Sequence, residues 1–223
     1  MGILKKISKL NIRSLILNFY LFPLNQAVHL PLLLSKSVKL ADFYRGGVQI
    51  NCKKIVPAMI QIGYSDVGTI DARANCSVLQ ISKGGRLLFN GRTHIGAGCN
   101  ISVGSEGYLS FGKNMRCTGN TSFISHAKIS FEDDCLVSWN CTFMDTDFHR
   151  IIKNGMVINM PSEIVIHHNS WIGCNCIVLK GAELPSDSVL GAGSLLNKHF
   201  SEENCIYAGS PAKPIVRNIE WKE

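Results

Sequence analysis

Branched aliphatic residues recur every six positions through the C-terminal third of the chain. In steps of six, these positions are Ile166, Ile172, Val178, Leu184, Leu190 and Leu196. A small residue follows four positions after each of the first five, at Ser170, Cys176, Ala182, Ser188 and Ser194. An α-helix of period 3.6 would scatter these residues around its circumference, and an ordinary strand alternates with a period of two. The pattern therefore predicts a parallel β-helix of hexapeptide repeats, in which each aliphatic side chain stacks on its equivalent in the next coil.

The same period appears earlier in the chain with one change of phase. The first set of apolar positions is Phe111, Cys117, Phe123 and Ile129, and after a shift of two the set continues with Phe131, Val137 and Phe143. Ile95 and Ile101 are also six apart. Between residues 50 and 90 the pattern is less regular, and we expect atypical first coils there because terminal repeats often differ from internal ones. The predicted fold class is all-β.

The repeat is interrupted between residues 143 and 166, in the stretch "FMDTDFHRIIKNGMVINMPSEIVI". The spacing of these two apolar positions is not a multiple of six, so the chain leaves the coil after about Asp145 and returns near Glu163. We expect a protruding loop at about 150–163. Long loops on rigid scaffolds often carry function. Asp145, Asp147 and His149 lie where the chain is released, which makes them candidate site residues.

The N-terminal segment, residues 1–45, differs from the predicted β-helix domain, residues 46–223. Its apolar positions follow helical spacing, with basic residues on an adjoining face, which predicts a basic amphipathic helix. The positions are Ile3, Ile7, Leu10, Leu17 and Leu21, with Lys5, Lys6, Lys9 and Arg13. The longest uninterrupted apolar run is too short to span a bilayer, and the segment lacks the pattern of a secretory signal. Two interpretations stay open: the helix packs on the core or a neighbouring subunit, or it makes peripheral contact with the cytoplasmic face of an anionic membrane.

Composition narrows the cellular context and the class of partner. The nine cysteines are odd in number, form no CxxC pair and fall on interior positions of the repeat, which favours reduced thiols and a cytoplasmic protein. The formal net charge is +7, and residues 1–41 carry six basic side chains and no acidic one. The predicted β-helix is therefore nearly neutral, which argues against a nucleic-acid-binding protein.

The segments "WIGCNCIVLKGAELPSDSVLGAGSLLNK" and "IYAGSPAKPIVRNI" complete the pattern. With the repeat, they resemble the left-handed β-helix acyltransferases, in particular the sugar and polysaccharide O-acetyltransferases of the maltose/galactoside acetyltransferase-like branch. The resemblance covers residues 95–219. It implies a homotrimer with active sites between subunits, acetyl-CoA as acyl donor, a saccharide acceptor and no metal.

By this resemblance, His149 is the catalytic base and Asn120, in "CTGNTSF", contacts the acceptor or the acetyl group. Trp171 lines the site, and Gly173 and Ala192 lie against the pantetheine arm of CoA. The remaining implied CoA positions are Asn197, Lys198, Lys213 and Arg217. Asn197 replaces the hydroxyl residue that is usual at its position.

Acetyl transfer to a hydroxyl needs a base for the nucleophile, a group that orients the base and a donor for the oxyanion. A neutral histidine suits the first role, and Asp147 is preferred over Asp145 for the second. A backbone N–H or the Asn120 amide suits the third. His126 is the rival base, and a covalent route through a cysteine is disfavoured because no activating group is apparent.

Two other functions use the same fold. One is an N-acetyltransferase that acts on an amino-sugar nucleotide. The other is a non-enzymatic or metal-binding scaffold, for which His126, His149 and His168 would be the candidate ligands.

Overall fold

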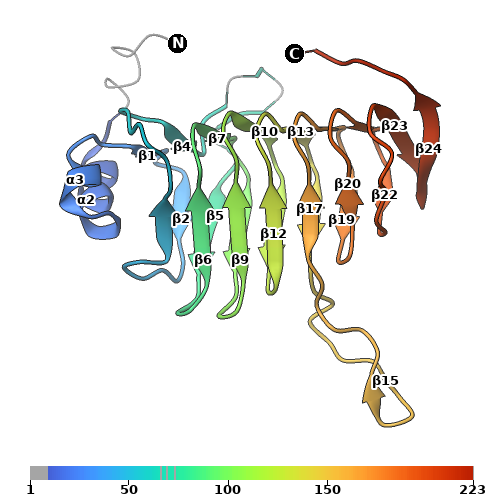
Figure 1. Ribbon diagram of the computed structural model, residues 1–223. Helices are drawn as coiled ribbons and strands as arrows, with labels where there is room; N and C mark the ends of the chain where they lie inside the picture. The colour runs from blue at the N-terminus through green and yellow to red at the C-terminus, as the bar shows by residue number, and fades with distance from the viewer. Residues whose placement is uncertain (1–9, 66, 69, 73, 223) are drawn as a thin grey trace.

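The chain folds into a three-sided β-helix whose coils stack along one axis, with two short helices covering the first coil (Figure 1). The computed structural model describes residues 10–65, 67–68, 70–72 and 74–222. Each full coil contributes one strand to each of three sheets, so a strand pairs with strands of the coils before and after it. The predicted all-β, left-handed parallel β-helix is confirmed.

Three sheets form the sides of the prism within the described residues. Sheet A contains, in spatial order, β1 (Leu32–Leu34), β4 (Ile60–Ile62), β7 (Thr93–Ile95), β10 (Met115–Gly119), β13 (Leu136–Trp139), β18 (Trp171–Ile172), β21 (Val189–Leu190), β23 (Cys205–Gly209) and β24 (Ala212–Arg217). Sheet B contains β2 (Val38–Leu40), β5 (Ser77–Ile81), β8 (Asn100–Val103), β11 (Ser122–Ser125), β14 (Thr142–Met144), β19 (Ile177–Leu179) and β22 (Leu195–Leu196). Sheet C contains β3 (Val48–Ile50), β6 (Arg86–Phe89), β9 (Tyr108–Phe111), β12 (Lys128–Phe131), β17 (Ile164–Ile166) and β20 (Glu183–Leu184).

The coils become shorter along the axis. Leu87 pairs with Leu109, 22 residues later, and Leu109 pairs with Ile129, 20 residues later. In the last coils Ile172 pairs with Leu190, 18 residues later. Three strict hexapeptides make an 18-residue coil, whereas a 20-residue coil leaves two residues over. This difference explains why the six-residue period is regular after residue 164 and shifts by two before it.

The inward side chains form one continuous core along the axis. All six predicted aliphatic positions of the last coils are buried with an exposed fraction of 0%: Ile166, Ile172, Val178, Leu184, Leu190 and Leu196. In the middle coils aromatic rings stack instead. The ring centroid of Phe123 lies 5.3 Å from those of both Phe111 and Phe143. Apolar burial between neighbouring coils therefore holds the prism together.

Asn and Asp residues make the turns where sheet C leads into sheet A. The backbone is left-handed, with φ between 49° and 62°, at Asn114, Asp134, Asn169, Asp187 and Asn204. These two residue types tolerate that conformation better than other residues with a Cβ atom. They also link coils, because Asn114 Nδ2 donates to Asp134 Oδ1 (2.9 Å) and Asn169 Nδ2 donates to Asp187 Oδ1 (2.7 Å).

The β-helix begins earlier than the expected residue 46. β1 and β2 pair with β4 and β5, so residues 32–45 form strands and corners of the first coil. The second coil pairs regularly with the third, although residues 63–76 make a long connection between β4 and β5. That connection and the three-residue strands obscure the six-residue period in this region.

Helices α2 (Ile12–Leu21) and α3 (Leu24–Ala27) cover the open end of the first coil. One face of α2 packs on the core through Leu17 and Leu21, and Phe22 and Ala27 are buried beside it. The expected helix thus packs on the end of the core, and its expected N-terminal part lies outside the described residues: Ile3, Ile7, Lys5, Lys6 and Lys9.

Two polar side chains of α2 complete the exposed edge of β1. Asn18 accepts a hydrogen bond from Leu32 N (2.9 Å) and donates to Leu32 O (2.8 Å). Ser14 Oγ accepts from Leu34 N (2.9 Å) and lies 3.2 Å from Leu34 O, to which it donates. An unpaired strand edge is a template for aggregation, and here two side chains take the place of the missing strand.

A hairpin projects from the body between β14 and β17 (Figure 1). It consists of β15 (Ile152–Lys153) and β16 (Met156–Val157), which pair antiparallel. Asn154 and Gly155 connect them with φ of 53° and 76°, and an Asn-Gly pair with positive φ is typical of a tight hairpin turn. The expected protruding loop near 150–163 is therefore an ordered hairpin with its root at residue 145.

We predict that Asn18→Ala lowers the free energy of unfolding by about 2–4 kcal/mol, because it leaves two buried backbone groups of Leu32 without partners. Urea denaturation would measure the change. Ile16→Ala, on the exposed side of the same helix, is the matched control and should change stability by no more than about 0.5 kcal/mol. Equal effects of the two substitutions would contradict this role of Asn18.

Candidate active site

The corner between sheets B and C carries two of the three residues predicted for catalysis, His149 and Asp147. It consists of the loops 126–127, 145–163, 180–182 and 197–198, each from a different coil. His149 lies in the first of the two hairpin arms, close to the root. His126 lies one coil earlier and Lys180 one coil later, so the corner brings together residues far apart in the sequence.

Asp145 fixes the root of the hairpin from inside the prism. Its side chain is fully buried and accepts hydrogen bonds from Ser125 Oγ (2.9 Å), His126 N (2.7 Å) and Ala127 N (3.0 Å). All three donors belong to the preceding coil. Asp145 is therefore committed to structure, and its carboxylate lies away from solvent.

Asp147 ties the two arms of the hairpin to the following coil. Its carboxylate accepts hydrogen bonds from Lys180 Nζ (2.5 Å) and Asn159 Nδ2 (2.8 Å). The hydrogen bonds from Lys180 and Asn159 lower the pKa of Asp147, so it is ionised at neutral pH. Asn159 Nδ2 also donates to the backbone oxygen of His149 (2.8 Å).

The link from Asp147 to His149 thus runs through the backbone. Asp147 O accepts a hydrogen bond from His149 N (2.6 Å), whereas no hydrogen bond among the described residues joins the Asp147 carboxylate to the His149 imidazole. The expectation was that this carboxylate orients the ring. In the structure the carboxylate instead accepts hydrogen bonds from Lys180 and Asn159, and Asn159 also donates to the backbone of His149.

The two candidate bases have different surroundings. His149 is exposed, and in the described part of the chain its ring has no hydrogen-bond partner. His126 is half-buried, and its ring packs edge-on against Phe148, with 4.9 Å between centroids. Gly104 lies directly beneath the His126 ring, since a Cβ at that position would be 2.7 Å from His126 Nδ1. Of the two, His149 is the more accessible to an acceptor.

Asn120 does not meet His149 within one chain. It lies between β10 and β11, at the corner of sheets A and B, whereas His149 lies at the opposite edge of sheet B. The backbone of Asn120 is left-handed (φ 50°), and so is that of the residues that follow it at this corner, Asn140 and Asn175. Asn120 therefore has a structural role in the turn.

Trp171, Gly173 and Ala192 lie together on the last coils. Trp171, in β18, is 38% exposed and donates from Nε1 to Ser138 Oγ (3.2 Å). Gly173 and Ala192 occupy the corner between sheets A and B in successive coils. A Cβ on Gly173 would lie 2.6 Å from Ala192 N, so only glycine permits this close packing.

The predicted basic positions are spread over two corners. Asn197 and Lys198 are exposed at the corner of sheets B and C, and Lys198 Nζ lies 5.1 Å above the Phe200 ring centroid. Lys213 and Arg217 lie in β24, at the end of sheet A. Arg217 Nε pairs with Glu202 Oε1 at 2.8 Å, whereas Lys213 is exposed.

A groove of about 1620 Å³ lies over sheet C. Residues 51–57 form one wall, and Tyr108, Ser110 and Ser130 are among the residues of its floor. Lys128 lines it as well and forms an ion pair of 2.9 Å with Glu163, where the hairpin returns to the coil. The groove therefore extends to the root of the hairpin. Its hydroxyl, amide and aromatic groups suit a polar, extended ligand.

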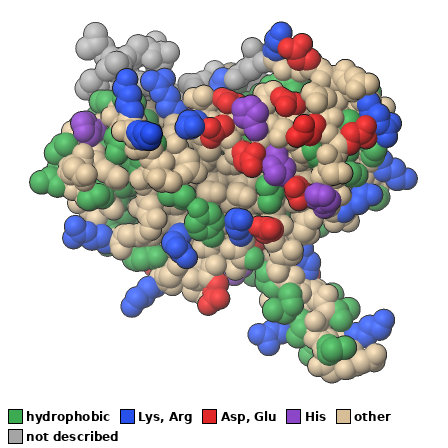
Figure 2. Space-filling model, viewed as in Figure 1, with side chains coloured by type: hydrophobic (Ala, Val, Ile, Leu, Met, Phe, Trp, Pro, Cys, Tyr) green, Lys and Arg blue, Asp and Glu red, His purple; other side chains and the backbone are tan. Residues whose placement is uncertain are grey.

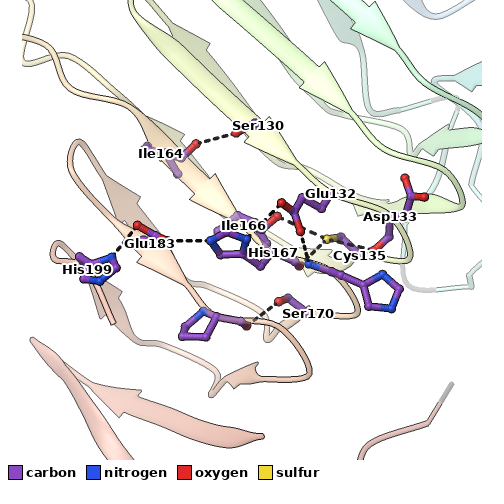
Figure 3. Close-up of polar contacts among 12 residues, drawn as sticks. Ser130, Glu132, Asp133, Cys135, Ile164, Ile166, His167, Ser170, Glu183 and His199 are labelled. Carbon is purple, nitrogen blue, oxygen red and sulfur yellow. Dashed lines mark hydrogen bonds and ion pairs between the residues drawn. The ribbon is translucent and has the colours of Figure 1, made fainter. Parts of the chain in front are cut away.

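Acidic and histidine side chains form a network on the C-terminal half of sheet C (Figures 2 and 3). His167 Nδ1 is 3.1 Å from Glu132 Oε1, and His167 Nε2 is 2.7 Å from Glu183 Oε1. Glu183 Oε2 is 2.5 Å from His199 Nδ1. The network links four successive coils, because His199 lies in the coil that follows Glu183. Within the described residues, no group of three or more His, Cys, Asp or Glu is arranged to hold a metal ion.

Charge in this network shifts two pKa values. Burial lowers the pKa of His167, but the hydrogen bond to Glu183 and the charges of Glu132 and Glu183 outweigh burial and raise it above 6.5. Burial raises the pKa of Glu183, but hydrogen bonds to His167 and His199 outweigh that effect and lower it below 4.5. Between pH 4.5 and pH 6.5, the two ordinary pKa values, both Glu183 and His167 are therefore charged and their ion pair is fully formed.

We predict that the network stabilises the fold most between about pH 4.5 and pH 6.5. The contribution of His167 is present below its unfolded pKa and is lost as pH rises through its raised folded value; that of Glu183 is lost as pH falls through its lowered value. Between pH 6 and pH 8.5, wild type should lose about 1–3 °C more in Tm than His167→Gln. Thermal melts at both pH values measure this, and equal losses would contradict it.

Six of the nine cysteines fit the expectation of buried thiols, whereas Cys76 is exposed and Cys52 and Cys174 are partly buried. The described cysteines are all free, and Cys99, Cys117, Cys135, Cys141, Cys176 and Cys205 are buried. Burial raises the pKa of Cys117, and it raises that of Cys135 to about 12. A thiol in this state is a poor nucleophile, because the thiolate is the reactive form.

The sequence did not predict the partners of the hairpin root. Lys180 and Asn159 hold Asp147, but neither lies on an inward position of the repeat, so periodicity carries no signal for them. The pair Asn154–Gly155 does carry a local signal for the hairpin, because this dipeptide between apolar residues is typical of a tight turn.

Comparison with known proteins supports the resemblance seen in the sequence. No family model matches the chain. An uncharacterised 24.8 kDa protein of the cps region of Klebsiella pneumoniae is 29% identical over 161 residues, 72% of this chain and 70% of that protein. The galactoside O-acetyltransferase of Escherichia coli K12 is 30% identical over 129 residues, 56% of this chain and 58% of the enzyme. The chain thus matches less than two thirds of the length of that enzyme.

The fold is also that of a solved acetyltransferase. The polysialic-acid-specific acetyltransferase NeuO superposes with a TM-score of 0.53 and 21% identity, covering 85% of this chain and 90% of that one. The chain is thus similar in sequence to a galactoside O-acetyltransferase, and its left-handed parallel β-helix is similar in fold to a solved acetyltransferase.

Proposed function

We propose that the protein is an acetyl-CoA-dependent O-acetyltransferase that transfers an acetyl group to a hydroxyl of a saccharide, in particular of a cell-surface polysaccharide or its precursor. The observation that carries the proposal is the root of the hairpin. His149 is exposed there on a segment fixed by Asp147 and Asn159. The similarity to a galactoside O-acetyltransferase supports the same reaction class.

In this proposal His149 is the general base. Its imidazole takes the proton from the acceptor hydroxyl as the oxygen attacks the acetyl carbonyl carbon of the thioester. The C–O bond forms, the C–S bond breaks, and the thiol of CoA leaves with a proton. A base positioned in this way contributes about 10²–10⁴-fold in rate. Asp147 is a positioning residue, because it acts on His149 through Asn159.

The acyl donor would lie along the corner of sheets A and B. Gly173 and Ala192 present close-packed backbone there, and their small side chains leave room for an extended pantetheine arm. Trp171 is exposed on the adjoining sheet A. Lys213 offers a cation for the CoA phosphates, and Lys198 and Arg217 are further candidate cations. Asn197 is neutral and is a candidate hydrogen-bonding partner of CoA. Thioester activation comes from CoA, and the protein supplies position and charge.

A homotrimer would complete the site. The hairpin exposes six large apolar side chains: Phe148, Ile151, Ile152, Met156, Ile158 and Met160. Exposed apolar clusters of this kind mark protein contacts. Asn120 lies at the far edge of sheet B from His149, so it could serve as an oxyanion donor only for the His149 of a neighbouring subunit.

The groove on sheet C is the proposed path of the acceptor. It reaches the hairpin root at Lys128, and Lys53, Lys54 and Arg92 line it as well. An acceptor of several sugar residues could lie across sheet C with one hydroxyl at His149. The free cysteines support a reducing compartment, and we place the reaction in the cytoplasm on that ground.

We predict that His149→Ala lowers the rate of acetylation by about 10²–10⁴-fold. Mass spectrometry would follow a pool of oligosaccharides and amino-sugar nucleotides incubated with acetyl-CoA. His29→Ala, which removes a histidine at the N-terminal end, is the control and should retain the wild-type rate. Wild-type rates in His149→Ala, with loss of product in His126→Ala, would transfer the role of base to His126. Product on an amino group alone would favour N-acetylation.

We predict that Asp147→Asn lowers kcat by about tenfold without shifting the pH of half-maximal rate, since the carboxylate acts through Asn159 rather than on the imidazole. Lys180→Met should have a similar effect, and the double variant should lose little more, because residues of one hydrogen-bonded unit are not additive. A shift of the rate profile to lower pH in Asp147→Asn would show instead that Asp147 contacts the ring.

A further inference from the structure

The N-terminal cap carries apolar side chains on the face that points away from the β-helix. The exposed fractions are 79% for Ile12, 62% for Ile16, 46% for Phe19, 69% for Leu24 and 55% for Val28. Ile12, Ile16 and Phe19 are spaced by four and three residues, so they form one stripe along α2. Leu24 and Val28 continue it over α3. Figure 2 shows this group of hydrophobic side chains at the N-terminal end of the prism.

This outer face has no part in covering the core. The inner face of α2 already fills the end of the first coil with Leu17 and Leu21, and it completes the edge of β1 through Ser14 and Asn18. A surface helix ordinarily carries polar residues on its outer side. Here both sides are apolar, which indicates a second partner for α2.

Basic side chains lie on the cap and in the first coil. Arg13 lies on α2 and donates a hydrogen bond to Val38 O in the first coil. Lys36 and Lys39 belong to that same coil, and residues 1–41 contain no acidic residue. Lys5, Lys6 and Lys9 add three positive charges directly upstream in the sequence. The partner of this face therefore has an apolar layer beneath a negatively charged surface.

A second copy of the chain fits these observations poorly. Two copies that met through their caps would bring like charges together across the contact, and like-charge contact opposes association. An anionic lipid bilayer provides both features at once, since its headgroups attract Lys and Arg while its acyl layer accepts apolar side chains. In the described residues no helix has the length and apolar character to cross a bilayer, so the contact is a surface one.

We propose that the outer face of α2 and α3 docks on an anionic membrane surface, with Ile12, Ile16, Phe19, Leu24 and Val28 entering the interface. The β-helix then stands with its axis away from the membrane. Four strand spacings separate β2 from β14 in sheet B, and at about 4.8 Å each the hairpin root lies about 20 Å from the cap.

The distance between the hairpin root and the membrane decides which acceptors can reach the site, an inference that rests on the proposed function. The candidate active site would lie in solution but close to the lipid headgroups. A saccharide attached to a membrane lipid would then present its sugars at the level of His149. Soluble saccharides would meet the same site without help from the membrane.

The test is co-sedimentation of the full chain with vesicles of phosphatidylcholine alone or with phosphatidylglycerol added. We expect binding to the anionic vesicles only. Binding should be weaker at 0.5 M than at 0.1 M salt, because salt screens the attraction; the Debye length is already about 10 Å at 0.1 M. Ile16→Glu/Phe19→Glu should weaken binding by about tenfold or more. Ile215→Glu/Val216→Glu, which places the same charges on exposed apolar positions of β24, is the matched control and should bind as wild type.

Several outcomes would overturn the proposal. Absence of binding to anionic vesicles, or equal binding by wild type and Ile16→Glu/Phe19→Glu, would exclude this face. A smaller oligomer for that variant in sedimentation velocity, with no vesicle binding by wild type, would assign the face to a neighbouring subunit. Acetylation of a soluble acceptor, measured in parallel, tests the proposed function separately, and it should be equal in wild type and the Ile16→Glu/Phe19→Glu variant.

Discussion

Each coil of this β-helix can bury its inward side chains only against the coils on either side of it. The aliphatic column from Ile166 to Leu196 and the stacked rings around Phe123 are the two forms that this contact takes. A stack of this kind has two open ends, each with an unpaired strand edge and an uncovered core. The chain closes the first end with α2, whose Ser14 and Asn18 take the place of a strand. It closes the other with β24, which turns back antiparallel on β23.

The same constraint decides where function can lie. The interior is filled, so chemistry is left to the corners and the outer faces. The hairpin between residues 145 and 163 leaves at one corner, and its root is tied to the coil before through Asp145 and to the coil after through Lys180. Those two anchors hold the backbone of His149 at a defined place although its side chain is exposed. A loop fastened in this way combines access for a large acceptor with the rigidity that positioned catalysis needs.

The outer faces of the molecule differ in the charge of their side chains. The C-terminal half of sheet C carries the network of Glu132, His167 and Glu183, whereas the N-terminal cap is basic and apolar. Between them the groove on sheet C leads toward the hairpin. In the functions proposed above, one end of the molecule meets an anionic surface, the middle binds a saccharide and the last coils bind the acyl donor.

Much of the fold could be predicted because coil stacking imposes a repeat on the sequence. The inward positions are confirmed, and the interruption at residue 143 marked the excursion that carries His149. The first coil was placed too late, because the connection 63–76 hides the period. The partners of Asp147 could not be predicted either. Lys180 is 33 residues away and meets Asp147 only because one coil, hairpin included, brings the same corner around again.

By itself, the sequence determined the β-helix, its core positions and the excursion with its histidine, because burial repeats every six residues and leaves a periodic record. Only the tertiary structure decided which side chains meet at each corner of the β-helix. It separated Asn120 from His149 along sheet B, turned the carboxylate of Asp147 toward Lys180, and left the outer face of α2 uncovered. Corner and surface positions carry no periodic signal, since their neighbours depend on the length of every coil between them.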